Sequence, residues 1–223
     1  MKIFAINGSP RKNWNTATVL QKVLDGAASA GHDVVTEMVH LYSLRFEPCL
    51  SCFECKKIGG KSYGRCAVVD DLTPLLQSID ESDGIILGSP IYFGGLTAKM
   101  QAFFERLCFP YLVYSPSYPS LAPKKLATAF VYTMNVTEEI MEQWQYRVTL
   151  DRTASMLGRL HTPAEQLYVY NTYQFSDYGK YKCDIFKEED KARQRQEQFP
   201  LDCERAFALG EGMVQRIRKE GQG

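Results

Sequence analysis

The sequence predicts an α/β protein whose core is a five-stranded parallel sheet. Short, mostly apolar segments of strand length alternate along the chain with longer segments whose apolar residues recur at helical spacing. Two of the short segments, residues 2–7 and 84–88, are mostly apolar, as in strands buried on both faces. Strands separated by helices in this way pair in parallel through right-handed crossovers. The chain has 223 residues, 45% of them hydrophobic, which suits one large domain better than two.

The first predicted strand and helix flank a polar loop. Residues 2–7 form an apolar run that ends at Gly8, which predicts a strand. The helix that follows is predicted from apolar residues at helical spacing, namely Val19, Leu20, Val23, Leu24 and Ala27. We expect Asn15 or Thr16 to cap its first turn and Gly31 to end it.

The middle of the chain repeats the order of strand and helix. A second strand is expected at residues 33–39. A helix is expected at residues 70–80, because the acidic pair at its start suits the positive end of the helix dipole. Residues 84–88 predict a fully buried strand, and residues 96–107 an amphipathic helix.

The last part of the predicted sheet has the same pattern. A strand is expected at residues 126–133 and a fifth strand at 167–170. Between them we expect one helix at residues 137–157, with Gly158 just past its end.

Two segments fall outside this alternation. Residues 109–125 are rich in proline and tyrosine and predict a long loop, which suits a lid or a subunit contact. The C-terminal part begins with residues 187–198, which are charged on all sides and predict a solvated helix or tail that Pro200 interrupts. An apolar stripe then predicts a last helix laid on the sheet: Cys203, Phe207, Gly210, Val214 and Ile217.

Charge and cysteine content narrow the class of protein. The 26 Lys and Arg residues balance the 26 Asp and Glu residues, which gives no electrostatic case for binding nucleic acid or an anionic membrane. The apolar stretches are too short to span a bilayer, and we find no signal peptide. Seven cysteines, four of them close together, favour a reducing compartment. We therefore expect a cytoplasmic protein.

The loop after the first strand has the composition of a phosphate site. Residues 8–16 place a tight turn, two hydroxyl groups, two cations and a helix N-terminus together. Ser9, Thr16, Arg11 and backbone N–H groups can all donate hydrogen bonds to a phosphate. The alternative is a polar turn followed by a capped helix. The loop lacks the sequence signatures of nucleoside triphosphatases and of dinucleotide-binding folds.

The loop after the third strand, residues 89–95, places two aromatic side chains beside two glycines. Such a loop forms either a wall for a flat ring or a packed turn. Together, Gly8-Ser9-Pro10-Arg11 through Asn15-Thr16 and Ser89-Pro90-Ile91-Tyr92-Phe93-Gly94 resemble the flavodoxin-like NAD(P)H-dependent FMN reductases and iron-sulfur flavoproteins. As a fold, the resemblance covers residues 2–170.

This resemblance implies a flavodoxin-like, doubly wound sheet in the order 2-1-3-4-5, with an FMN-binding domain at residues 1–185 and a helical extension at 186–223 packed on it. It implies that the FMN phosphate is held by Ser9, Arg11, Asn15 and Thr16. It implies that the ring and ribityl chain contact Pro90, Ile91, Tyr92, Phe93 and Gly94, with a weaker third motif at Thr133, Met134 and Asn135. One departure is Trp14, where family members often have glycine; the indole either covers the ligand or faces solvent.

A cysteine motif, C-x2-C-x2-C-x10-C, occurs at Cys49, Cys52, Cys55 and Cys66. Thiolates so close in sequence can face one metal centre. The motif resembles that of the iron-sulfur flavoproteins in part, because their last spacing is typically shorter. A [4Fe-4S] cluster, redox-active free thiols and a zinc ion remain open. Four basic residues between the third and fourth cysteines are expected to favour thiolates.

The sequence therefore predicts an FMN-dependent oxidoreductase that passes electrons from NAD(P)H to a quinone, a nitro compound, free flavin or an iron-sulfur acceptor. No side chain is expected to act as acid or base, since the cofactor supplies the reactivity. The alternatives are an FMN electron-transfer protein without nicotinamide oxidation and a non-catalytic flavin-binding regulator. The resemblance implies a homodimer or homotetramer and a small-molecule or protein electron acceptor.

Overall fold

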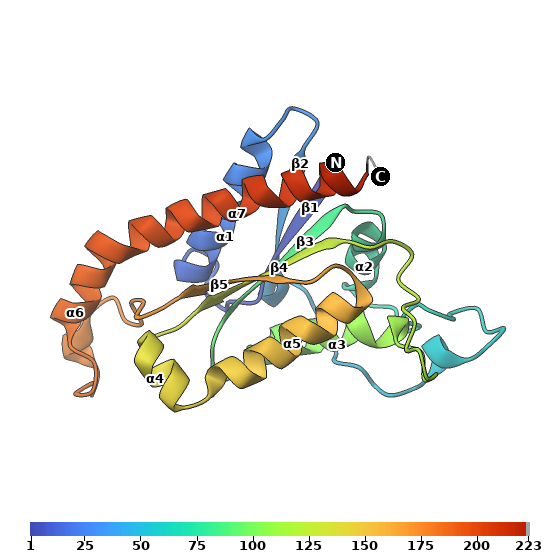
Figure 1. Cartoon of the computed structure of the whole chain (residues 1–223). Helices are drawn as coiled ribbons and strands as arrows, with labels where there is room; N and C mark the ends of the chain where they lie inside the picture. The colour runs from blue at the N-terminus through green and yellow to red at the C-terminus, as the bar shows by residue number, and fades with distance from the viewer. Residues whose placement is uncertain (222–223) are drawn as a thin grey trace.

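Five parallel strands form the central sheet in the order β2-β1-β3-β4-β5 (Figure 1). The strands are β1 (Lys2–Asn7), β2 (Val35–His40), β3 (Gly84–Pro90), β4 (Ala127–Thr133) and β5 (Glu165–Val169). The computed structural model describes residues 1–221. The predicted fold class, strand number and strand order are confirmed. Each predicted strand lies within about three residues of the observed one, and apolar runs mark the buried strands β1, β3 and β4.

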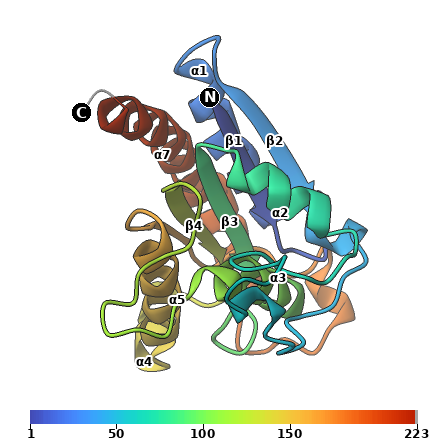
Figure 2. The same cartoon turned by 90° about the vertical axis from the view of Figure 1, so that its right-hand side faces the viewer.

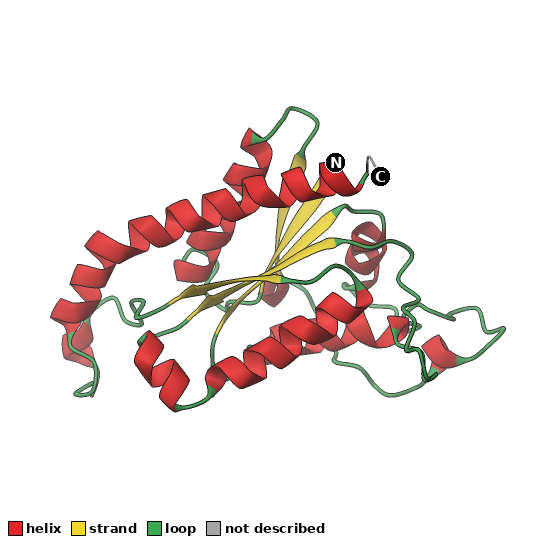
Figure 3. Cartoon of the chain, viewed as in Figure 1, coloured by secondary structure: helices red, strands yellow, loops and turns green. Residues whose placement is uncertain are grey.

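Helices cover both faces of this sheet (Figures 2 and 3). They are α1 (Asn15–Ser29), α2 (Thr73–Asp80), α3 (Ala98–Cys108), α4 (Glu138–Gln143), α5 (Tyr146–Leu160), α6 (Glu188–Arg193) and α7 (Phe199–Glu220). Helices α1 and α7 pack on one face of the sheet, over a core that contains Ile3, Ile86 and Val131. Helices α2, α3 and α5 pack on the other face, over Phe4 and Phe130.

The crossing of α1 and α7 is unusually close. A Cβ atom added to Gly26 would lie 1.9 Å from the carbonyl oxygen of Phe207, and one added to Gly210 would lie 1.9 Å from that of Val23. Both glycines therefore permit contact between helix backbones. Helix α7 reaches the sheet at β4 and β5, as predicted, and packs mainly on α1.

Two helix predictions are wrong in detail. The helix predicted at residues 137–157 is two helices, α4 and α5, separated at Gln145, which has a φ of 58°. Gly158 lies inside α5 rather than past its end. The acidic pair expected to open the helix at residues 70–80 lies before α2, which begins at Thr73. Asp70 binds Arg106 instead.

The C-terminal segment also differs from its prediction. Residues 187–198 are not solvated throughout, because Lys191 on α6 is fully buried. A π-helical turn at Gln194–Gln198 joins α6 to α7. Pro200 does not interrupt the helix, because it occupies the first turn of α7, where no backbone N–H is needed.

Candidate functional site

A cavity of about 200 Å³ opens at the carboxyl ends of the parallel strands. In a doubly wound sheet, ligands bind at this edge where the strand order reverses. The loops after β1, β3 and β4 contribute to the cavity, together with the segment after β5. Its lining is Ser9, Arg11, Trp14, Asn15, Thr16, Pro90, Ile91, Tyr92, Thr133, Met134, Asn135, Thr172, Tyr173 and Gln174.

The loop between β1 and α1 is fixed by its own side chains. The Oδ1 atom of Asn7 accepts a hydrogen bond of 2.8 Å from the backbone N–H of Ser9, and the Oγ of Ser9 accepts one of 3.1 Å from that of Arg11. The Nδ2 atom of Asn7 also pairs with Nδ1 of His40 at 3.0 Å. Burial and then Lys12 lower the pKa of His40. These bonds fix the start of the loop and tie it to the end of β2.

The first turn of α1 has no side-chain cap. Trp14, not Asn15 or Thr16, is the N-cap residue, and its side chain makes no capping bond. Asn15 and Thr16 are buried and face other loops: Asn15 Nδ2 donates to the Tyr173 carbonyl at 2.8 Å, and the Thr16 and Thr133 hydroxyls lie 2.7 Å apart. The free N–H groups of this turn therefore carry the positive end of the helix dipole into the cavity.

The segment after β5 crosses this loop and adds Thr172, Tyr173 and Gln174 to the cavity lining. Trp14 Nε1 and Asn15 Nδ2 both donate to the Tyr173 carbonyl, the first at 3.1 Å, and Arg11 Nη1 donates to the Gln174 carbonyl at 2.5 Å. The indole of Trp14 lines the cavity and is half-buried, with the Arg11 guanidinium 5.3 Å from the ring centre. Of the two readings of Trp14, covering the cavity fits this position better than facing solvent.

The aromatic loop after β3 forms a tight turn at the rim. Tyr92 and Gly95 exchange two backbone hydrogen bonds of 2.9 and 3.0 Å, and Phe93 and Gly94 between them have φ angles of 52° and 78°. The turn leaves the Phe93 side chain fully exposed. A Cβ atom on Gly94 would lie 2.8 Å from the Tyr146 ring, so this position requires glycine. Tyr92 lines the cavity, as do Pro90 and Ile91, whereas Phe93 and Gly94 lie outside its lining.

The loop after β4 completes the wall. The Met134 N–H donates to the Val169 carbonyl at 2.9 Å, which extends the sheet pairing beyond β4. Asn135 follows, and its Oδ1 atom is buried without a hydrogen-bond partner among the described residues. An unpaired buried acceptor is costly, and here it belongs to a residue that lines the cavity.

The cysteine motif lies in a second place, on the chain between β2 and α2. All four cysteines, Cys49, Cys52, Cys55 and Cys66, line one small hollow together with Arg106. Within residues 1–221 no three histidine, cysteine or acidic side chains are arranged to hold a metal ion. The structure thus brings the predicted thiols to one hollow without assembling them as a ligand set.

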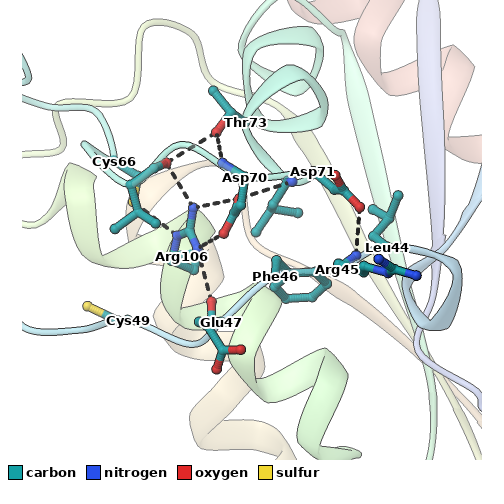
Figure 4. A network of polar contacts seen from close by, with 12 residues as sticks. Leu44, Arg45, Phe46, Glu47, Cys49, Cys66, Asp70, Asp71, Thr73 and Arg106 are labelled. Carbon is teal, nitrogen blue, oxygen red and sulfur yellow. Dashed lines mark hydrogen bonds and ion pairs between the residues drawn. The ribbon is translucent and has the colours of Figure 1, made fainter.

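Arg106 on α3 fixes the chain around these cysteines (Figure 4). Its buried guanidinium donates to both Asp70 carboxylate oxygens, at 2.7 and 3.1 Å, and to Cys66 Sγ at 3.0 Å. It also donates to the carbonyls of Glu47 and Val68, at 2.9 and 3.2 Å. One side chain therefore joins the two ends of the cysteine segment. Hydrogen bonding to Arg106 and Leu72 outweighs the opposing effect of burial and lowers the pKa of Asp70.

The basic residues of this segment do not produce the expected effect on Cys55. Burial, the largest influence, raises the pKa of the Cys55 thiol, and Lys56 opposes this only in part. Lys56 instead donates to the carbonyls of Phe109, Pro110 and Leu112. Burial is also the main cause that lowers the pKa of Lys56.

None of the helices in the described part of the chain is long and apolar enough to cross a membrane.

Comparison with known proteins agrees with this architecture. An iron-sulfur flavoprotein of Methanocaldococcus jannaschii is 38% identical over 106 residues, which are 48% of this chain and 51% of that protein. The chain spans about half the length of the curated relatives it matches.

Two solved structures are similar over nearly the whole chain. An NAD(P)H:quinone oxidoreductase from Methanothermobacter marburgensis has a TM-score of 0.68, with 16% identity and 96% of each chain covered. An FMN-dependent NADH-azoreductase from Bacillus anthracis in complex with FMN has a TM-score of 0.60 and 10% identity, covering 97% of this chain and 99% of that chain. At these identities the likeness establishes the fold alone.

A family model described as NADPH-dependent FMN reductase matches residues 1–145, which is more than half of the 223 residues. The chain therefore belongs to the NADPH-dependent FMN reductase family.

Proposed function

We propose that the cavity at the carboxyl ends of the strands binds FMN and that the protein oxidises NAD(P)H. The observation that carries this proposal is the convergence of three loops on one cavity with an uncapped helix N-terminus and the unpaired buried acceptor of Asn135. A phosphate monoester fits the uncapped helix N-terminus, because free N–H groups and the dipole favour an anion. The N–H and hydroxyl groups of a flavin fit the unpaired acceptor of Asn135.

Ser9, Asn15 and Thr16 are placed to bind the phosphate together with the first N–H groups of α1. Arg11 uses one guanidinium nitrogen on the Gln174 carbonyl and keeps other donors for the phosphate. The ring and ribityl chain are assigned to the other two loops: Pro90, Ile91, Tyr92, Phe93, Gly94, Thr133, Met134 and Asn135.

When bound, FMN would accept a hydride from the nicotinamide and pass two electrons to an acceptor. The described cavity lining contains no carboxylate and no imidazole, so no side chain there is an obvious proton donor or base at neutral pH. The protein residues would bind and orient the two ring systems, and water would supply the protons. Similarity to a quinone oxidoreductase and to azoreductases makes quinones and azo compounds the first acceptors to assay, with nitro compounds and free flavin next.

The test is to titrate the purified protein with FMN and record its absorption and fluorescence. We expect Thr16→Val to weaken binding roughly tenfold, because it removes a hydrogen bond to a charged group. Thr153→Val, at a half-buried position on α5 outside the cavity lining, is the matched control. A wild-type protein that does not bind FMN would refute the proposal.

Steady-state oxidation of NADH and NADPH with each acceptor then separates the alternatives. An electron-transfer protein would bind FMN without oxidising either nicotinamide. A non-catalytic regulator would bind FMN without turnover toward any acceptor.

The four cysteines are proposed as a second redox centre. Two observations favour this: all four line one hollow, and relatives are named iron-sulfur flavoproteins. Because the thiols are not arranged as a ligand set, no electron path is assigned through them. Analysis of iron and acid-labile sulfide in anaerobically purified protein decides between a [4Fe-4S] cluster and free thiols, and zinc analysis covers the third case.

We also propose that the protein is a cytoplasmic homodimer or homotetramer, with residues 1–185 as the FMN-binding domain and 186–223 as its extension. The exposed aromatic residues at the rim, Tyr92, Phe93 and Trp144, suit a subunit contact. Light scattering after size-exclusion chromatography measures the subunit number. Limited proteolysis tests whether the extension separates from the domain.

A further inference from the structure

Lys191 on α6 is a fully buried cation with no carboxylate within ion-pairing distance in residues 1–221. Its Nζ donates to the carbonyl oxygen of Asn135 and, at 2.6 Å, to the Oδ1 of Asn171. The ring of Phe186 lies 4.6 Å from the same nitrogen. A buried charge held only by neutral groups is expensive, so its position calls for a functional explanation.

The two groups that Lys191 binds belong to two loops of the proposed flavin site. Asn135 follows β4, and Asn171 follows β5, where it has a φ of 52°. Backbone bonds join the same loops: Asn171 N–H donates to the Val136 carbonyl at 2.8 Å, and Thr172 N–H to that of Met134 at 2.9 Å. Lys191 completes this junction from the C-terminal extension, outside the matched residues 1–145.

Asn135 is held in a specific way. Its carbonyl oxygen faces Lys191, while its side-chain Oδ1 is buried without a partner and the residue lines the cavity. The contact with Lys191 therefore fixes the backbone from which the unpaired acceptor projects. The positive charge of Lys191 also lies directly behind Asn135, a residue of the cavity wall. The low dielectric constant of this buried position strengthens the electric field of the charge.

We propose that Lys191 is a positioning residue for FMN: it fixes Asn135 in the cavity wall, and its charge favours the reduced flavin over the oxidised flavin. This inference rests on the proposed function. Hydride transfer from NAD(P)H adds two electrons and one proton to the flavin and leaves NAD(P)⁺. The flavin thereby gains one negative charge, which a buried cation nearby stabilises.

The wild-type protein offers a pH test. Burial lowers the pKa of Lys191 to about 8, with Cys183 and Asp190 opposing the shift in part. The other groups that contact its ammonium, Asn135, Asn171 and Phe186, do not titrate. Lys191 is then protonated at pH 7 and loses its charge as the pH rises through 8, so FMN binding is expected to weaken over this range.

The decisive experiment compares Lys191→Met with Lys187→Met, an exposed lysine at the start of the same helix. Dissociation constants are measured for oxidised FMN by fluorescence and for reduced FMN under anaerobic conditions. We expect Lys191→Met to weaken binding of oxidised FMN several-fold and of reduced FMN about tenfold more than that, the scale of one lost interaction with a charged group. Lys187→Met should match the wild type.

The same measurements show which idea fails. Absence of FMN binding by the wild type would overturn the proposed function. If the wild type binds and Lys191→Met keeps the wild-type ratio of the two constants, only the role of Lys191 is overturned, because a purely structural residue would weaken both forms alike. Should Lys191→Met not fold, the wild-type pH profile decides: a constant affinity from pH 7 to 9.5 would refute the inference.

Discussion

Two buried cations each hold a loop region of this protein together, and they do so through different kinds of partner. Arg106 joins the ends of the cysteine segment and has a carboxylate partner in Asp70, whereas Lys191 joins two loops of the proposed flavin site through neutral oxygens only. Hydrogen bonding to Asp70 raises the pKa of Arg106 despite the opposing effect of burial, while burial lowers that of Lys191 to about 8. A buried cation with a counterion is a permanent structural link, and one without it can respond to pH.

The largest effect on the free energy of unfolding is expected in the region around Arg106. Arg106→Met should lower the free energy of unfolding by about 3–5 kcal/mol, because it leaves the Asp70 carboxylate without its ion-pair partner. Urea denaturation measures this loss. The double variant Arg106→Met/Asp70→Asn should recover part of it, and a double variant no more stable than the single one would contradict the ion-pair explanation.

Lys191→Met should cost less, about 1–2 kcal/mol, because it leaves the acceptors on Asn135 and Asn171 without their donor while the removal of a costly buried charge offsets part of that loss. The same denaturation series, with Lys187→Met as control, provides the measurement. A cost equal to that of Arg106→Met would remove the distinction between the two regions.

Raising the pH should change the stability contribution of Lys191. The folded-state pKa of Lys191, about 8, lies below its ordinary value of 10.5, so the unfolded chain binds the extra proton between these values. The stability of the wild type relative to Lys191→Met should therefore rise with pH across this window, by at most about 1.4 kcal/mol per pH unit. Unfolding at pH 7, 8.5 and 10 tests the sign, and a falling difference would contradict it.

The smallest effect is expected at Cys66. Cys66→Ala should lower the free energy of unfolding by less than about 1 kcal/mol, because Arg106 keeps its four bonds to oxygen and loses only one to sulfur. Thermal unfolding under reducing conditions is sufficient to measure it. A loss as large as that of Arg106→Met would mean that sulfur, not the carboxylate, dominates this region.

Much of the fold could be predicted because its signals are local. The strands β1, β3 and β4 are buried on both faces, and their sequences are mostly apolar runs. The break at Gln145 could not be predicted, since neither glycine nor proline marks it. The burial of Lys191 could not be predicted either, because its partners lie 20 and 56 residues away along the chain.

The candidate site also has parts that could be predicted from the sequence and parts that could not. The loops after β1 and β3 could be predicted because their residue types suit a phosphate and a flat ring, and the loop after β4 was implied by the family resemblance. The hydrogen bonds from the segment after β5 could not be predicted, since Tyr173 and Gln174 contribute backbone carbonyls, which any residue could supply. Asn15 and Thr16 were assigned to a capping role as well, but the loops opposite them take up their side chains.

The backbone contact between α1 and α7 has an evolutionary consequence. Gly26 lies within the part of the chain that matches the family model, and Gly210 lies outside it. Neither position can accept a larger residue while the opposite helix stays where it is, since the added atom would overlap a carbonyl group. Homologues that lack a helix equivalent to α7 are free to replace the first glycine, so small residues at the two positions should be inherited and lost together.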